Sequence, residues 1–196
     1  MLSNPNVSET ILMASSQVTF SLRVALPEDA TAIASLIAAS ARHLCGGDYT
    51  PAQVEAALRA GVWGLDSQLI ADGTYFVAEA GAEIVGCGGW GRRRTLFGGD
   101  KTSNRSAELL DPQRDAARIR AFFVSPVWAR KGIGRALLEW CEREARAAGF
   151  KALELGATLP GTRLYRSHGY VAGEPQSYDL GEGIFMDVIP MRKALE

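Results

Sequence analysis

Residues 122–138 read FFVSPVWARKGIGRALL, and this stretch decides how the fold of the chain is interpreted. A run of β-forming residues stops at Pro126, and a basic turn containing Gly132 and Gly134 leads into an apolar, helix-periodic segment. Glycines let a backbone approach a ligand closely, and successive amides at a helix start lie at the positive end of its dipole. A strand, a glycine turn and a helix in this order are typical of a phosphate site.

Cationic side chains surround this turn at Arg130, Lys131 and Arg135. Positive charge is unfavourable at a helix N-terminus, so three cations there without an anion would destabilise the helix start. A tight turn with basic residues is the alternative, but a bound phosphate explains the charges and the glycines together. We therefore predict a phosphate site formed by Arg130, Lys131, Gly132, Ile133, Gly134 and Arg135.

Two other nucleotide-binding motifs fit this stretch less well. The P-loop pattern G-x-x-x-x-G-K-[ST] is absent from the sequence. A dinucleotide fingerprint is approached by Gly132 and Gly134, with Glu154 about 20 residues further on. Leu137 stands at the third glycine position, however, and too little chain follows for a doubly wound fold. A dinucleotide-binding oxidoreductase, which NAD would stabilise, is therefore the weakest alternative.

The patterns outside this stretch predict a single mixed α/β (α+β) domain over residues 18–196, preceded by a flexible N-terminal extension over residues 1–17. Alternation predicts strands and 3.6-residue periodicity predicts helices. No shift in composition divides the chain. The predicted elements are a strand at 18–25, helices beginning at Pro27 and Thr50, a hairpin at 74–80 and 83–90, a strand at 117–124, a helix at 132–148, a strand at 151–155, a short helix at 161–167 and a hairpin at 170–180 and 183–191.

Composition excludes several classes of protein. The chain has 196 residues, a net charge of -1 and 47% hydrophobic residues, which excludes a disordered chain and gives no bulk charge for nucleic acid or a membrane. Its cations are 17 arginines and 4 lysines. Three widely spaced cysteines and two isolated histidines argue against a disulfide framework or a metal site, and no apolar run reaches the roughly 18 residues of a membrane span. We predict a cytoplasmic protein without a metal.

The motifs at 122–134 resemble those of the GCN5-related N-acetyltransferase (GNAT) superfamily. The family signature is Gln/Arg-x-x-Gly-x-Gly/Ala after a strand that ends in aromatic-Val-x-Pro. Here Phe123-Val124-Ser125-Pro126 is followed by Ala129-Arg130-Lys131-Gly132-Ile133-Gly134. The resemblance covers about Thr19 to Lys193. The chain departs from the signature at Ala129, where the usual Gln or Arg helps to hold pyrophosphate; the neighbouring Arg130 could compensate.

This resemblance implies a mixed, mostly antiparallel central sheet of six to seven strands flanked by about four helices. It also implies acetyl-CoA as co-substrate, with its pyrophosphate on the amides of residues 130–135. The pantetheine arm would pair with the backbone of Phe122, Phe123 and Val124 like an added strand. The Val124 N–H would polarise the thioester carbonyl.

A second family motif, Leu164-Tyr165-Arg166-Ser167-His168-Gly169-Tyr170, follows. Amide formation expels a thiolate, and a tyrosine hydroxyl is reliably protonated at neutral pH, so it can supply the proton. By resemblance Tyr165 is the general acid; the alternative is a core tyrosine on an amphipathic helix. No general base is identified. Glu79, Glu154 and His168 are candidates only by position, and a water chain would also serve.

The resemblance places the acceptor between the first two helices and the C-terminal hairpin, which predicts substrate contacts at Tyr49, Trp90, Arg118 and Arg120. Alternation puts Arg118, Arg120 and Phe122 on one strand face. If that face lines the pocket, the acceptor carries a carboxylate or phosphate; otherwise the arginines pair with Asp or Glu on adjacent strands. Residues 92–114 form an unusually long loop, predicted to be functional or mobile. Its Arg92 to Arg94 predict a solvated cluster or a dimer contact.

These observations predict an N-acetyltransferase that moves the acetyl group of acetyl-CoA to a primary amine by direct attack in a ternary complex. The acceptor is a small molecule or a peptide or protein amine, and its identity stays open. A homodimer is possible, because dimers are common in this superfamily. The alternative is a non-catalytic acetyl-CoA sensor, which Ala129 and the missing base suggest. Thiol release would support the enzyme, and stabilisation by CoA without turnover would support the sensor.

Overall fold

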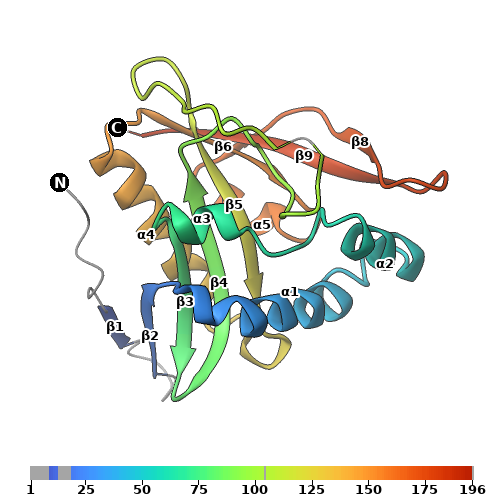
Figure 1. Ribbon diagram of the computed structural model, residues 1–196, viewed down its shortest axis with the longest axis horizontal. Helices are drawn as coiled ribbons and strands as arrows, with labels where there is room; N and C mark the ends of the chain where they lie inside the picture. The colour runs from blue at the N-terminus through green and yellow to red at the C-terminus, as the bar shows by residue number, and fades with distance from the viewer. Residues whose placement is uncertain (1–8, 13–18, 104, 196) are drawn as a thin grey trace.

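The computed structural model describes residues 9–12, 19–103 and 105–195. One sheet runs through it in the order β1-β2-β3-β4-β5-β6-β9-β7, with β8 paired to β9 (Figure 1). The strands are β1 (Glu9–Leu12), β2 (Thr19–Val24), β3 (Tyr75–Ala80), β4 (Glu83–Gly91), β5 (Ala117–Val124), β6 (Ala152–Ala157), β7 (Val171–Ala172), β8 (Gln176–Asp179) and β9 (Phe185–Ala194). The α-helices are α1 (Ala30–Leu44), α2 (Pro51–Arg59), α3 (Ser67–Ala71), α4 (Ile133–Ala147) and α5 (Thr162–Ser167), with 3-10 turns at Pro27–Asp29 and Pro126–Trp128.

This architecture confirms the predicted fold class. Among the described residues, β5 and β6 form the single parallel pair and the other strand pairs are antiparallel. Two elements within residues 19–195 differ from the sequence prediction. The five-residue α3 is too short to give a periodic pattern. The first arm of the predicted last hairpin is divided into β7 and β8 around Pro175, which has no N–H to donate to a sheet.

The predicted N-terminal extension is only partly described by the structure. Residues 9–12 form β1 and pair antiparallel with β2, from Glu9 opposite Leu22 to Leu12 opposite Thr19. This strand gives the sheet an edge that the prediction of a flexible extension did not include. The rest of the predicted extension, residues 1–8 and 13–17, lies outside the described residues.

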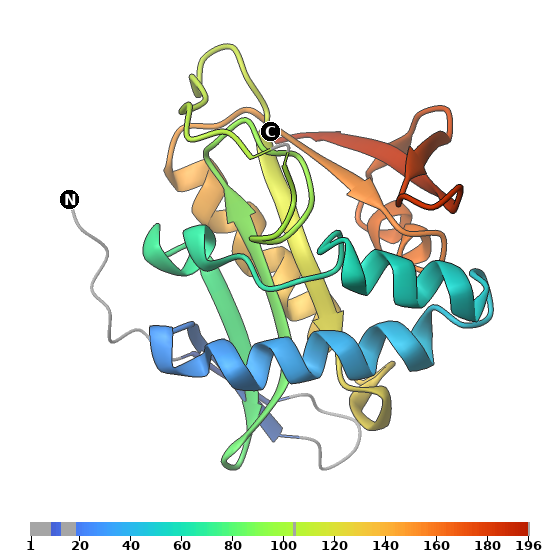
Figure 2. The same ribbon diagram turned by 45° about the vertical axis from the view of Figure 1, so that its right-hand side comes forward.

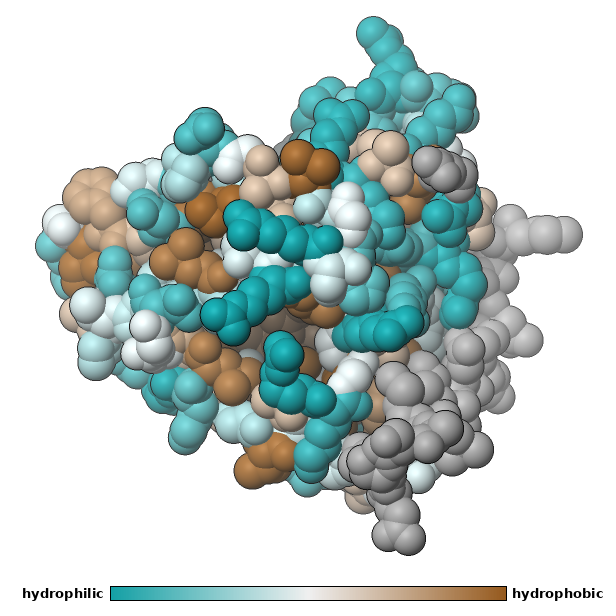
Figure 3. Space-filling model, turned by 180° about the vertical axis from the view of Figure 1, so that it is seen from behind, coloured by the Kyte–Doolittle hydropathy of each residue, from teal (hydrophilic) through white to brown (hydrophobic). Residues whose placement is uncertain are grey.

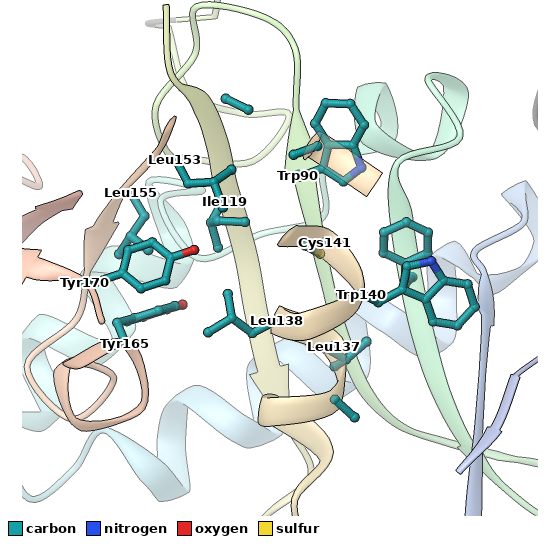
Figure 4. Close-up of a cluster of buried hydrophobic side chains, with 14 of the residues drawn as sticks. Trp90, Ile119, Leu137, Leu138, Trp140, Cys141, Leu153, Leu155, Tyr165 and Tyr170 are labelled. Atoms are coloured by element: carbon teal, nitrogen blue, oxygen red, sulfur yellow. The ribbon is translucent and has the colours of Figure 1, made fainter. Parts of the chain in front are cut away.

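Helices cover both faces of the sheet. In Figure 2, α1, α2 and α3 lie on one side of the central strands and α4 lies on the other. The predicted apolar stripe of α4 is buried, with Leu137 and Cys141 at 0% exposure. Trp140 of this stripe stacks on Phe76 of β3 with ring centroids 5.0 Å apart. Figure 4 shows these α4 side chains meeting residues of β4, β5 and β6. Packing of this amphipathic face, rather than intrinsic propensity, holds α4 against the sheet.

The strands β5 and β6 separate after a short contact. Their parallel register consists of Ala117 opposite Leu153 and Arg118 opposite Glu154. Beyond these pairs β6 is joined to β9, while β5 stays joined to β4. The remainder of β5 therefore has a free edge, and the two strands form the sides of an opening.

A β-bulge lies at this free edge. Ala121 has a φ of 55°, and the register with β4 shifts between Cys87 and Gly89, so that two residues of β5 oppose Gly88. A bulge reverses the alternation of the strand beyond it. The prediction that Phe122 shares a face with Arg118 and Arg120 is therefore wrong: Phe122 packs on the α4 face. A Cβ on Gly88 would lie 2.8 Å from the Phe122 ring, so the glycine provides the space for that ring.

Residues 92–116, called here the β4–β5 loop, fold back on themselves rather than run freely. Arg93 and Leu109 form a bridge, and Arg93 also pairs with Asp72 at 2.8 Å. Arg94 pairs with Glu108 at 2.7 Å. Arg92 to Arg94 were predicted to form a solvated cluster or a dimer contact. At least two of them, Arg93 and Arg94, instead anchor this loop through ion pairs.

The described residues hold neither a cluster of metal ligands nor a membrane-spanning helix. They contain no group of three or more His, Cys, Asp or Glu side chains that could hold a metal ion. None of the helices in this part of the chain is both long enough and apolar enough to cross a membrane.

Candidate active site

The basic turn has the backbone geometry of an anion site. Arg130 and Gly132 have φ values of 64° and 86°, and α4 begins at the next residue, Ile133. These left-handed residues direct the intervening amides away from helical hydrogen bonds. Within the described part of the chain, no amide of residues 130–135 donates to a backbone carbonyl; the first to do so is that of Ala136, to Gly132. The start of a 15-residue helix therefore offers a series of unpaired donors.

Cations lie around these donors as the sequence predicts. Arg130 and Lys131 are exposed, and the Lys131 ammonium lies 4.7 Å from the centre of the Trp128 ring. Arg135 pairs with Glu139 at 2.8 Å, one helical turn further on. Figure 3 shows the back of the molecule, where strongly hydrophilic side chains gather around a hollow near the centre of that face.

A cavity of about 240 Å³ extends from this turn along the free edge of β5. Its walls come from α1, the segment after α2, the β4–β5 loop, the bulged end of β5, the start of α4, β6, α5 and β9. The lining residues with most bearing on function are Ser40, Trp63, Phe97, Arg120, Phe122, Phe123, Val124, Gly134, Thr158, Tyr165, Met186 and Val188.

The amide of Val124 faces α1 at the edge of this cavity. It donates to the Ser40 hydroxyl oxygen at 3.3 Å, whereas the next amide, that of Ser125, donates to Val85 of β4 at 2.8 Å. Ser40 is 4% exposed and lies on the buried face of α1 with Ile33, Leu36 and Ile37. The amide predicted to polarise a thioester is thus within reach of the cavity, and a side-chain oxygen satisfies it.

Tyr165 lies on the opposite side of the cavity. Its ring packs edge-on against Phe122 at 6.3 Å and against Tyr170 at 5.7 Å, as Figure 4 shows for the two tyrosines. Burial raises the pKa of Tyr165 well above its ordinary value, so the hydroxyl stays protonated at neutral pH. The described residues supply no hydrogen-bond partner for this hydroxyl.

Close packing joins the turn to the helix that carries Tyr165. A Cβ on Gly134 would lie 3.3 Å from the Leu164 side chain, which is tighter than ordinary contact. Glycine at this position therefore lets α4 begin directly against α5. The two family motifs, some 30 residues apart in the chain, meet at one wall of the cavity.

Three of the four predicted acceptor contacts, including Tyr49 and Trp90, do not line the cavity. The Tyr49 hydroxyl donates to the Asp187 carbonyl at 2.7 Å and accepts from the Leu159 N–H at 3.0 Å, so it ties three segments together behind the wall. Burial raises the pKa of Tyr49 to about 12. Trp90 is a core residue on the α4 face, with its ring 6.0 Å from that of Phe150. Large aromatic residues are signals of a pocket only when the fold leaves space beside them.

The predicted pair Arg118 and Arg120 contacts carboxylates. Arg118 lies against Glu154 on the neighbouring strand. Arg120 pairs with the fully buried Asp66 at 2.8 Å and also donates to the Gly98 carbonyl. Arg105 approaches the same Asp66 at 2.7 Å. Burial lowers the pKa values of both Arg118 and Arg120 below the ordinary arginine value. Both arginines therefore pair with carboxylates, which was the alternative to an anionic acceptor. Of the two, only Arg120 reaches the cavity.

The three positional candidates for a general base lie elsewhere. Glu79 pairs with Arg23 at 2.6 Å, and Glu154 is the partner of Arg118. The His168 ring nitrogen Nδ1 lies 2.9 Å from the Leu164 carbonyl. Among the described residues that line the cavity there is no Asp, Glu or His.

The sequence prediction missed three cavity residues that the fold brings together. Ser40 carries a usable signal, because it is a polar residue in register with the apolar face of α1. Trp63 and Phe97 carry none, because each lies in irregular structure, and their neighbours in the cavity come from distant parts of the chain.

Comparison with known proteins identifies the family of the chain. A family model described as "Acetyltransferase (GNAT) domain" matches residues 71–172, which include the basic turn and the motif around Tyr165. The chain therefore belongs to the GNAT family of acetyltransferases, as the resemblance in its motifs predicts.

Three similar proteins, one matched by sequence and two by structure, illustrate this likeness. An "IAA acetyltransferase" of Azospirillum brasilense is 32% identical over 149 residues, covering 74% of this chain and 80% of that protein. A GCN5-related N-acetyltransferase structure from Rhodopseudomonas palustris has a TM-score of 0.67 and 25% identity, covering 89% and 94% of the two chains. A PaiA N-acetyltransferase from Thermoplasma acidophilum, solved with coenzyme A, has a TM-score of 0.64 and 15% identity, covering 91% and 100%.

Proposed function

We propose that the protein transfers the acetyl group of acetyl-CoA to a primary amine by direct attack in a ternary complex. One observation carries this proposal: Gly134 of the turn, the Val124 amide and the buried Tyr165 lie along a single cavity. The names of the similar proteins support it. The relative from Azospirillum brasilense is called an acetyltransferase, and a structural neighbour from Salmonella typhimurium was solved with acetyl-CoA.

The residues of the turn fit a pyrophosphate group. The unpaired N–H groups of residues 130–135 would hold its oxygens at the positive end of α4, and Arg130 and Lys131 would supply formal charge. Arg130 lies next to Ala129, the position where the family usually has Gln or Arg, so it stands in for that side chain. The free edge of β5 would pair with the pantetheine arm as an added strand.

The acetyl group of acetyl-CoA supplies an activated carbonyl, and the chain would act on it from two sides. The Val124 N–H would turn from Ser40 to the carbonyl oxygen and stabilise the negative charge that develops there. Tyr165 would donate its proton to the departing sulfur, and its raised pKa keeps that proton available. The cavity walls are mostly apolar, so water beside the reacting atoms would find few hydrogen-bond partners there.

The sensor alternative retains one supporting observation, because the described lining of the cavity contains no carboxylate or imidazole to act as a base. The two functions predict different results in one experiment. An enzyme releases free thiol from acetyl-CoA when an amine is added. A sensor is stabilised against heat by CoA and releases none with any amine.

The Tyr165→Phe variant tests the catalytic part of the proposal. We expect kcat to fall by about 10²- to 10⁴-fold, the usual contribution of a positioned acid, with acetyl-CoA affinity unchanged. The matched control is Tyr170→Phe, which removes a buried hydroxyl from the adjacent ring that does not line the cavity. Equal kcat values for Tyr165→Phe and the unmodified protein would exclude Tyr165 as the acid.

A further inference from the structure

The half of the cavity remote from the basic turn is apolar and aromatic. Its walls include Trp63, Phe97, Met186 and Val188, with Cys45 at its α1 side. Other rings hold the two aromatic walls in place. Trp63 packs edge-on against Tyr49 at 5.7 Å, and Phe97 packs edge-on against Tyr178 at 5.0 Å. The aromatic walls of this half are therefore each packed against a neighbouring ring.

Charge is nearly absent from this half. Among the described lining residues Arg120 alone is charged, and its guanidinium is engaged by Asp66 at 2.8 Å. No carboxylate of the lining could pair with an ammonium group. Moving an alkylammonium ion into such a cavity would remove its hydration without replacement, which is strongly unfavourable.

An alkyl amine would also need to lose a proton before attack, because its pKa lies near 10. The described lining offers no Asp, Glu or His to accept that proton. An amine attached directly to an aromatic ring avoids both costs, since its lone pair is delocalised and it is neutral at pH 7. It would enter the cavity uncharged and with its nucleophilic lone pair available.

The size of the cavity agrees with a ring. An apolar cavity of roughly 150 Å³ is enough to hold benzene. The whole cavity measures about 240 Å³, so a ring of this size would take up a large part of it.

We infer that the acceptor is an arylamine, held between Trp63 and Phe97; this inference rests on the proposed acetyltransferase function. In the reaction the amine nitrogen forms a bond to the acetyl carbon, and the bond from that carbon to sulfur breaks. The nitrogen loses one proton to water, and the sulfur takes the proton of Tyr165, which solvent then restores. The products are an N-aryl acetamide and free CoA.

Acceptor preference and its pH dependence test the inference. The probes are 4-methoxyaniline, 4-methoxybenzylamine, spermidine and a lysine-containing peptide, with thiol release measured from acetyl-CoA between pH 7 and 9. At pH 7 we expect kcat/KM for the aniline to exceed that for the benzylamine by about a hundredfold, because nearly all of the benzylamine is protonated. The aniline profile should be flat, and the benzylamine rate should rise about tenfold per pH unit.

The outcomes separate this inference from the proposed function. Preference for spermidine or the lysine peptide at pH 7 would overturn the arylamine assignment and leave acetyl transfer intact. Stabilisation by CoA with no thiol release from any of the probes would contradict both the proposed function and the inference.

Two variants of the β4–β5 loop test whether the acceptor binds in this half of the cavity. Phe97→Ala should raise KM for 4-methoxyaniline by about tenfold or more, the effect of losing one aromatic contact, with KM for acetyl-CoA unchanged. Leu96→Glu places a carboxylate at a half-buried position of the lining and should shift preference towards the benzylamine. The matched control is Leu109→Glu, in the same loop but 58% exposed and outside the cavity.

Thermal unfolding of each variant shows whether it folds. If Phe97→Ala does not fold, Phe97→Leu keeps the apolar volume while removing the ring, and the same rise in KM is expected. Unchanged KM and acceptor preference in folded Leu96→Glu and Phe97 variants would overturn the assignment of the acceptor to this half of the cavity.

Discussion

The basic turn and the apolar half of the cavity around Trp63 and Phe97 are built in opposite ways. That apolar half, where we propose that the acceptor binds, is called here the acceptor half. The turn is a run of consecutive residues, 130–135, whose amides are left unpaired by the conformations of Arg130 and Gly132. The acceptor half takes side chains from α1, the segment after α2, the β4–β5 loop and β9, which are distant in sequence. A local segment forms the first, and only tertiary packing forms the second.

This difference determines what each region depends on. The turn depends on backbone conformation, so changes within it should affect ligand binding directly. The acceptor half depends on the position of the β4–β5 loop. Asp66 fixes that loop by pairing with Arg105 from it and with Arg120 from β5.

The largest expected effect is therefore on stability, from Asp66→Asn. Removing this carboxylate leaves two guanidinium groups without their shared partner, and breaking a buried pair typically costs about 3–5 kcal/mol. Each kcal/mol lowers Tm by about 2–4 °C in a chain of this size, which differential scanning calorimetry measures. The control is Glu55→Gln, which removes an exposed ion pair with Arg42 and should leave Tm nearly unchanged. Equal Tm values for the two variants would show that Asp66 does not anchor the loop.

A smaller effect is expected within the turn, from Gly132→Ala. A side chain in the left-handed conformation costs about 1–2 kcal/mol, and any relaxation redirects the amides proposed to hold phosphate. We expect acetyl-CoA to bind about tenfold more weakly in isothermal titration calorimetry.

Gly73→Ala is the matched control for strain alone. Gly73 also has a positive φ, of 68°, and no atom lies within 4 Å of the added Cβ. This variant should lose similar stability and keep its acetyl-CoA affinity. Equal weakening of acetyl-CoA binding in both variants would show that the turn around Gly132 does not bind acetyl-CoA.

The smallest effect is expected where the two regions meet, from Ser40→Ala. If the Ser40 hydroxyl satisfies the Val124 amide only in the free protein, its removal destabilises the free state and not the complex. We expect acetyl-CoA to bind about two- to tenfold more tightly, corresponding to one hydrogen bond of about 0.5–1.5 kcal/mol. Ser35→Ala, on the exposed side of the same helix, should leave the affinity unchanged. Weaker binding of acetyl-CoA by Ser40→Ala would show instead that the Ser40 hydroxyl stabilises the complex.

Sequence reasoning succeeded where the physical cause is local. The strand, the turn and the helix around Gly132 follow from propensity, glycine freedom and periodicity, all of which act within a few residues. The apolar stripe of α4 is buried as predicted, because the same periodicity determines which face the helix presents to the sheet. The family resemblance adds Tyr165, which the fold brings to the cavity wall.

Sequence reasoning failed where the physical cause is a partner distant in the chain. The bulge at Ala121 turned Phe122 away from Arg120, and alternation alone cannot reveal a register shift against β4. Trp90 and Tyr49 have the composition of ligand contacts, but Phe150 packs on the first and the Asp187 and Leu159 backbones bond the second.

The sequence by itself thus determined the fold class, the glycine turn at residues 130–135 and the family to which the chain belongs, since short-range geometry carries each of these. The tertiary structure alone decided the chemistry of the acceptor half. Whether an arginine is free to bind an anion depends on whether a carboxylate lies beside it, and Asp66 lies 54 residues before Arg120 in the chain. The same packing leaves the described cavity lining without a carboxylate, and that composition carries the arylamine inference.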